Sequence, residues 1–199
     1  MRALGVLPGV SRLLLVYFHY HLAFAVYPSV WSYFGKAQFG WSPAMIGGSL
    51  ALFGAAMAVV QGGLIRPVLH RFAERGTVLI GFVCSITTFG LIATVTWGSA
   101  ILILTPLAAL AGVIPPALQA LMSARVTPER QGALQGLLTS ASALAMVVAP
   151  LVMTSVFAAF TSASTPVYFA GAPFVLSMIL SVVALVVFRR VRINPAHVD

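Results

Sequence analysis

The bulk composition of the chain excludes a water-soluble globular domain. It has 199 residues, of which 60% are hydrophobic and only 7% are charged, and its mean hydropathy is +1.04. A chain this apolar belongs in lipid, because soluble domains carry about 25% charged residues. Eleven Lys and Arg against three Asp and Glu give a net charge of +8, which in a soluble protein would suggest nucleic-acid binding. The lone Cys84 excludes a disulfide framework.

Six apolar stretches are long enough to cross a bilayer. A spanning helix needs about 20 mainly apolar residues, because it crosses roughly 30 Å of hydrocarbon at about 1.5 Å per residue. The sequence therefore predicts an all-α, polytopic membrane protein, a six-helix bundle in a single domain over residues 1–199. The predicted spans are approximately 13–34, 43–65, 77–97, 100–122, 132–157 and 167–188.

The basic residues lie almost entirely in alternate loops, and this pattern predicts the orientation. Only Lys36 lies in a loop on the opposite side of the membrane. The ten basic residues on the first side are Arg2, Arg12, Arg66, Arg71, Arg75, Arg125, Arg130, Arg189, Arg190 and Arg192. By the positive-inside rule, residues 1–12 form the end of a cytoplasmic linker and 189–199 a cytoplasmic tail, in a multi-pass protein of the inner (cytoplasmic) membrane. Because these arginines are scattered through short loops at membrane edges, nucleic-acid binding is excluded as a function.

Local signals mark where helices begin and bend. Ser42 and Pro43 predict an N-cap and a first-turn proline for the second span, and Thr127 and Pro128 repeat the pattern before the fifth. Prolines also predict bends in four of the six helices, at Pro28, Pro115, Pro116, Pro150 and Pro173.

Polar side chains inside the spans mark helix contacts, a watery cavity or chemistry, because they are costly in hydrocarbon. The candidates for a substrate path are Gln61, Ser85, Gln119, Gln131 and Gln135. Gln131 and Gln135 are four residues apart and share one helix face, although hydrogen bonds between helices would explain them equally well. No Asp, Glu, Lys or Arg lies deep in a span, so a group that couples transport to protons must lie elsewhere unless a histidine supplies it.

His19 and His21 are the two histidines available in the first span. Their spacing puts them on opposite faces of a helix, so they cannot form a shared site alone. An interfacial or helix-contact role competes with a proton-relay role for either one. No metal site and no cofactor are expected.

Small residues predict where helices approach closely. Gly132, Gly136 and Ser140 recur every four residues along the fifth span, which predicts a packing seam for a neighbouring helix. Pro150 lies further along the same span and is interpreted as a structural hinge.

Four stretches of the sequence carry a family resemblance: 39–42, 45–51 and, most specifically, 116–123 together with 130–136. They resemble the C-terminal half of the tetracycline-efflux type of the major facilitator superfamily. The resemblance covers nearly the whole chain. It implies spans seven to twelve of a twelve-helix fold, a substrate path at the midplane between two six-helix halves, and drug export in exchange for protons, with antibiotic resistance as the outcome.

The resemblance carries over to individual residues in part. Gln61 matches a glutamine of the family's eighth span near the substrate path. The glutamine motif of the family's tenth and eleventh spans is matched by Gln119, Gln131 and Gln135. Ser85 departs from the pattern, because it stands where the tetracycline exporters carry a membrane aspartate, and serine does not titrate near neutral pH. The resemblance therefore supports efflux-type transport more than it supports tetracycline as the substrate.

The family resemblance also includes one loop. Residues 63–76 occupy the place of the superfamily's cytoplasmic glycine-and-arginine loop, with Pro67 where an aspartate is expected. The resemblance implies a conformational loop, although membrane topology alone also explains its arginines. Its residues are Gly63, Arg66, Arg71 and Arg75, together with Arg130.

One half of such a transporter presents only one wall of a cavity. We therefore expect the chain to act in the lipid bilayer with a small-molecule substrate and a partner, either an N-terminal six-helix half or a second copy of itself. Residues 2–12 look like the end of a linker, which favours the first. An inactive truncated fragment and a homodimeric six-helix channel or scaffold are the alternatives. An enzyme is not expected, because the sequence lacks the Gly-x-Ser-Gly nucleophile of intramembrane proteases.

Overall fold

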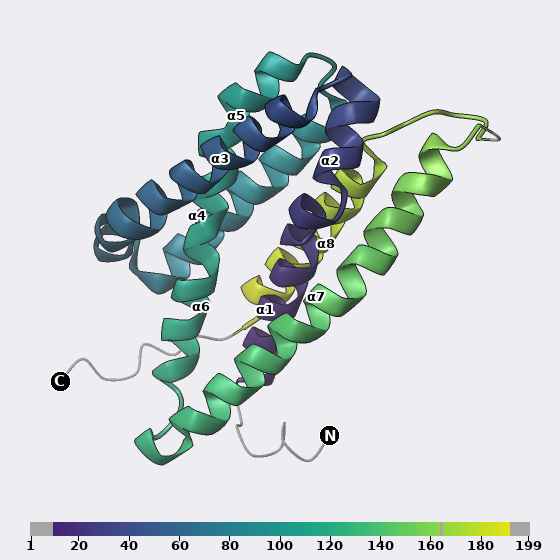
Figure 1. Cartoon of the computed structure of the whole chain (residues 1–199). Helices are drawn as coiled ribbons and strands as arrows, with labels where there is room; N and C mark the ends of the chain where they lie inside the picture. Colours follow the sequence, from purple (N-terminus) through teal and green to yellow (C-terminus); the bar gives the residue numbers. More distant parts are fainter. Residues whose placement is uncertain (1–9, 164, 192–199) are drawn as a thin grey trace.

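The computed structural model describes residues 10–163 and 165–191, which form helices joined by short turns (Figure 1). Within these ranges no β-strand occurs. The elements in chain order are α1 (Ser11–Phe24), α2 (Val26–Phe39), α3 (Pro43–Val59), a π-helical turn η2 (Val60–Leu64), α4 (Ile65–Thr94), α5 (Gly98–Leu110), a 3₁₀ turn η3 (Ala111–Val113), α6 (Ile114–Ser123), a 3₁₀ turn η4 (Pro128–Arg130), α7 (Gln131–Thr161) and α8 (Ala172–Arg189).

Five helical stretches in the described part of the chain are long and apolar enough to cross a membrane. They are Ser11–Phe39, Pro43–Thr94, Gly98–Ser123, Pro128–Thr161 and Ala172–Arg189. The prediction of an all-α polytopic membrane protein is confirmed. The second and third predicted spans, however, are joined in one stretch of 52 residues, and the predicted loop at 66–76 is helical on both sides of Ala73.

The 52-residue stretch is not straight. Ala73, with φ 52° and ψ 177°, is non-helical and divides α4 near its beginning. The chain doubles back between α3 and the end of α4 (Figure 1). The reversal therefore depends on a non-glycine residue in the left-handed region of φ, a conformation that is uncommon for alanine.

The prolines act in two different ways. Because Pro28 has no N–H, the Phe24 carbonyl lacks its usual helical partner, and the first span breaks at Ala25 between α1 and α2. Pro173 lies in the first turn of α8 and begins that helix, so the predicted bend there was wrong. The eighth helix accordingly starts at Ala172 rather than near residue 167. Pro150 lies inside α7.

The predicted helix starts are borne out to different degrees. Ser42 caps α3 as predicted: its Oγ accepts a hydrogen bond of 3.3 Å from the Met45 N–H, with Pro43 following. Thr127 holds the extended N-cap conformation, but its side chain makes no capping bond and a 3₁₀ turn precedes α7.

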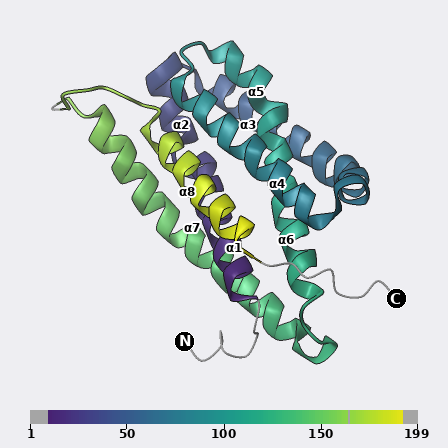
Figure 2. The same ribbon diagram turned by 180° about the vertical axis from the view of Figure 1, so that it is seen from behind.

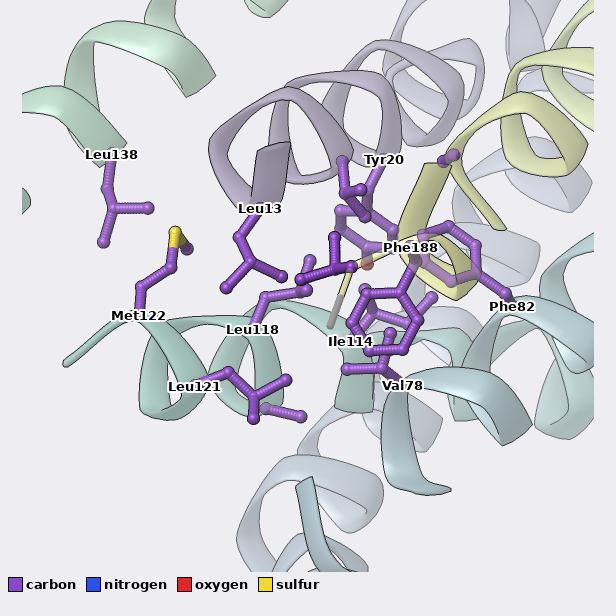
Figure 3. Close-up of a cluster of buried hydrophobic side chains, with 14 of the residues drawn as sticks. Leu13, Tyr20, Val78, Phe82, Ile114, Leu118, Leu121, Met122, Leu138 and Phe188 are labelled. Carbon is purple, nitrogen blue, oxygen red and sulfur yellow. The ribbon is translucent and has the colours of Figure 1, made fainter. Parts of the chain in front are cut away.

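Two buried clusters hold the helices together. The first joins α1, α4, α6 and α8, where Leu13, Phe82, Leu118 and Phe188 point toward one another (Figure 3). The second is aromatic and joins α2, α4 and α8; Phe34 and Phe174 lie 4.8 Å apart between ring centroids. Because lipid is as apolar as these side chains, helix association in a membrane depends on close van der Waals packing.

Two glycines allow the closest helix contacts. A Cβ at Gly171 would overlap the carbonyl oxygen of Ala93, and a Cβ at Gly81 would overlap the side chain of Ile114. These positions fix the approach of α8 and of η3–α6 to α4, which is the central helix of the bundle.

The faces of α3 and α7 are the most open. In α7, Leu134, Leu138, Ala145, Ala149 and Met153 are buried, and the helix packs on α1, α2 and α8. The packing seam predicted on α7 has no neighbouring helix among the described residues. Gly132, Gly136 and Ser140 are exposed, and nothing lies within 4 Å of a Cβ built on either glycine. On α3 only Ser49 is buried, and Gly47, Gly48 and Gly54 are equally open. No helix of the described chain fills these faces.

Candidate functional site

A cavity of about 270 Å³ opens where the end of α3 faces the start of α6. It is lined by Gln61, Ile65, Pro115, Pro116 and Gln119. Its polar groups are two side-chain amides, and none of its lining residues carries a charge. An amide both donates and accepts hydrogen bonds, so the cavity suits a ligand with uncharged hydrogen-bonding groups and an apolar body.

Gln61 reaches the cavity from the π-helical turn η2. Such turns insert an extra residue into a helix and are frequent at functional sites. Gly112, in η3, makes room for a neighbour of Gln61: a Cβ there would lie 2.7 Å from Met57 Cε, which is too close, and 3.6 Å from Gln61 Nε2, which is an ordinary contact. The absence of a side chain at Gly112 therefore lets Met57 pack against η3.

Gln119 connects the cavity to α7. It lies on α6 just after the Pro115–Pro116 pair that begins the helix, and its Nε2 donates a hydrogen bond of 3.0 Å to Gln135 Oε1. Three of the predicted glutamines are thus brought together, with Gln61 and Gln119 in the cavity wall and Gln135 bonded to Gln119.

Gln131 has a separate role. Its Oε1 accepts a hydrogen bond of 3.0 Å from Ser123 Oγ, and its Nε2 donates to the backbone oxygens of Ser123 and Val126 at 3.0 and 3.1 Å. These bonds close the turn between α6 and α7. Gln131 shares a helix with Gln135, as predicted, but it does not line the cavity.

Ser85 lies away from the cavity. It is buried on α4, and its Oγ is 3.4 Å from that of Ser181 on α8. Thr88, one turn along α4, is also buried, and its hydroxyl has no hydrogen-bond partner among the described residues. Ser85 therefore belongs to a polar seam between α4 and α8.

The two histidines lie on α1 and line neither the cavity nor a common site. His19 Nδ1 is 2.8 Å from the Leu15 carbonyl oxygen. The His21 ring packs on Tyr17 and Tyr20 at 4.4 and 5.3 Å, and its Nε2 is buried without a partner in the described part of the chain. No three His, Cys, Asp or Glu residues in these ranges gather as metal ligands would.

The predicted conformational loop is mostly helical. Gly63 lies in η2, two residues after Gln61, and Arg66, Arg71 and Arg75 lie on both sides of Ala73. These three arginines are exposed, as is Arg130 in η4. Between α6 and η4, partial burial lowers the pKa of Arg125 from its ordinary value, but a guanidinium stays charged at neutral pH.

Sequence reasoning missed part of the site. Pro115 and Pro116 were interpreted as bends, yet they also form a wall of the cavity beside Ile65. The one available signal was the run of Gln61 and two glycines, which indicates an irregular backbone beside a polar group.

Five apolar helical stretches of membrane-spanning length in the described chain define a multi-pass membrane protein. The family model of the Major Facilitator Superfamily matches residues 13–198, and the chain belongs to that family. Members of this superfamily are transporters rather than enzymes.

Curated relatives indicate which type of transporter within the superfamily the chain resembles. The chain is 35% identical over 190 residues to the class G tetracycline resistance protein of Vibrio anguillarum, covering 96% of this chain and 47% of the relative. It is 35% identical over 181 residues to the class C protein of Escherichia coli, covering 91% and 44%. The resemblance to the tetracycline-efflux type is confirmed. The chain spans less than half the length of these relatives.

Solved structures agree on the fold. The human organic anion transporter MFSD10 (TETRAN) superposes with a TM-score of 0.79 at 26% identity, covering 90% of this chain and 40% of that one. A peptide transporter (POT) superposes with a TM-score of 0.78 at 18% identity, covering 92% and 37%. The second likeness concerns the fold alone.

Proposed function

We propose that the chain forms one half of an exporter of small molecules and that Gln61 and Gln119 lie on its substrate path. The observation that carries the proposal is the uncharged cavity with two amides, which opens beside the exposed faces of α3 and α7. A site of this kind holds a substrate by a few hydrogen bonds and releases it again, as transport requires.

We infer six membrane crossings from the lengths of the five helical stretches. A straight helix of 52 residues would measure about 78 Å at 1.5 Å per residue, far more than the roughly 30 Å of hydrocarbon. We infer that Pro43–Thr94 crosses twice and that Ala73 lies near the reversal. With the arginine-rich ends inside, both chain ends lie in the cytoplasm and the membrane is the inner one.

A second six-helix half would cover the open faces. Small residues let helix backbones approach closely in membranes, and the glycines of α3 and α7 offer that approach without any occupant among the described residues. We favour an N-terminal half of the kind found in longer transporters, because the relatives are about twice the length of the match. The alternative partner is a second copy of the chain, with which it would form a homodimeric channel or scaffold. Without either partner, the chain would be an inactive fragment.

The substrate is a small molecule with uncharged hydrogen-bonding groups, and a tetracycline-like compound fits this description and the names of the relatives. We propose export in exchange for protons. No Asp or Glu lies deep in the described spans, so the coupling carboxylates belong to the second half. Within this chain His21 is the remaining candidate for a proton relay, because its buried Nε2 is unpartnered among the described residues.

The test measures tetracycline uptake into everted membrane vesicles in which the chain is co-expressed with the N-terminal half of the class G relative. Replacing Gln61 and Gln119 together by Ala removes both amides of the cavity, and we expect uptake to fall by about tenfold or more, since each lost hydrogen bond is worth about 1 kcal/mol. The matched control is Gln38→Ala. Gln38 lies outside the cavity and donates to the Val95 carbonyl at 3.2 Å, so uptake should be retained. Equal uptake by all three proteins would refute a role for the cavity.

A further inference from the structure

Three helix ends converge at the base of the first buried cluster. Leu13 near the start of α1, Val78 on α4 and Phe188 near the end of α8 belong to one packed group (Figure 3), which Val10 and Val191 extend outward. Because these residues pack together, the residues next to them along the chain are held at the same end of the molecule.

Four arginines lie close along the chain to the residues of this packed group. Arg12 precedes Leu13, Arg75 lies three residues before Val78, and two more arginines follow Phe188 directly. We define the helix-end arginine cluster as Arg12, Arg75, Arg189 and Arg190. All four are exposed, and none forms an ion pair with another described residue. The nearby acid along the chain is Glu74, which leaves a net positive surface.

Exposed apolar side chains lie one turn deeper in two of these helices. Leu15 is 46% exposed, three residues beyond Arg12 on α1, and Val186 is 44% exposed, three residues before Arg189 on α8. Exposed arginines at these helix ends, with exposed apolar side chains one turn deeper, match a molecule with an anionic head and an acyl tail.

Two helices that carry the cluster lie on the side of the molecule opposite the open glycine faces of α3 and α7. Figure 2 looks onto α4 and α8, whereas Figure 1 looks onto α3, α6 and α7. A second half seated on α3 and α7 would therefore leave α4 and α8 open to lipid.

We propose that the helix-end arginine cluster binds the phosphate of an anionic phospholipid in the leaflet at this end of the bundle. Guanidinium groups pair with phosphate through two parallel hydrogen bonds, so several of them around one headgroup favour an anionic over a zwitterionic lipid. The acyl chains lie along the exposed apolar residues of α1 and α8.

Native mass spectrometry of the purified full-length chain in non-ionic detergent tests this proposal. The protein is titrated with phosphatidylglycerol and, separately, with phosphatidylcholine of the same acyl chains. We expect tighter binding of phosphatidylglycerol. In R189Q/R190Q this preference should fall by about 25-fold, because each arginine near a membrane surface contributes about a fivefold factor.

The matched control is R66Q/R71Q, which also removes two exposed arginines, but from residues outside the cluster. It should keep its preference within about twofold, and both variants should melt as the parent does, since all four side chains are exposed. Raising the salt concentration should weaken phosphatidylglycerol binding in the parent. An unchanged preference in R189Q/R190Q, an equal loss in R66Q/R71Q, or displacement of the lipid by millimolar inorganic phosphate would each overturn the proposal.

Discussion

Gln119 on α6 donates a 3.0 Å hydrogen bond to Gln135 on α7 at the edge of the cavity. The same Gln119 also lines that cavity, so its amide has two possible partners, the neighbouring helix and a bound ligand. A ligand that takes the amide would loosen α6 from α7. A cavity residue that also joins two helices can therefore link occupancy to helix movement.

We expect replacement of Gln131 by Ala to lower the stability of the chain more than replacement of Gln135 by Ala. Gln131→Ala removes three hydrogen bonds that close the turn between α6 and α7, and should lower stability by about 2 kcal/mol, or the melting temperature by about 5 °C. Gln135→Ala removes one exposed bond and should change the melting temperature by less than about 2 °C. Thermal melts of the purified chain in detergent compare them, and equal losses would contradict the separate roles.

Two glycines provide a second comparison. A Cβ at Gly171 would overlap the Ala93 carbonyl, a backbone atom that cannot move aside, so Gly171→Ala should destabilise the chain by about 1 to 3 kcal/mol. Gly136→Ala adds the same methyl group where nothing lies within 4 Å, and should cause no loss. Melting temperatures measured side by side decide the matter. A stable G171A would mean that α8 does not approach α4 this closely.

The open face of α7 yields a prediction about assembly. Replacing Gly132 and Gly136 by Leu fills the predicted seam with bulky side chains, which should block the approach of a second half while leaving the melt of the chain alone unchanged. Co-purification with a tagged N-terminal half of the class G relative measures this. Undiminished co-purification of G132L/G136L would show that the partner binds elsewhere.

Ser85 tests the polar seam between α4 and α8. Ser85→Asp would bury a carboxylate with the Ser181 hydroxyl as its one near partner, and should destabilise the chain by about 3 kcal/mol at neutral pH. Ser85→Ala loses a single weak contact and should stay within about 1 kcal/mol of the parent. Unfolding measured for both variants in the same detergent gives the comparison. Tolerance of S85D would imply a water-filled route to this position.

The sequence predicted the helices well because their cause is local. Roughly 20 apolar residues in lipid must satisfy their backbone groups internally, so Gly98–Ser123 and Ala172–Arg189 could be expected from composition alone. The reversal between the second and third spans was also expected, but its position at Ala73 was not, because nothing in the residue type indicates a positive φ. Pro173 was misjudged because a proline bends a helix or begins it according to where the helix starts.

The site was predicted less completely because it depends on packing between distant segments. The residue types identified Gln61, Gln119 and Gln135 as costly in hydrocarbon, but their meeting depends on the π-helical turn that holds Gln61 and on the placement of α6 beside α7. Gln131 is the same residue type on the same helix, yet it closes a turn. Only the three-dimensional arrangement separates these roles.

Transport by the chain alone and in combination tests the central proposal most directly. Tetracycline uptake should be measured in everted vesicles that hold the chain alone, the N-terminal half of the class G relative alone, and both together. We predict background uptake for each alone and active, proton-driven uptake for the pair. Active uptake by the chain alone would contradict the account, because it would mean that this chain needs no second half.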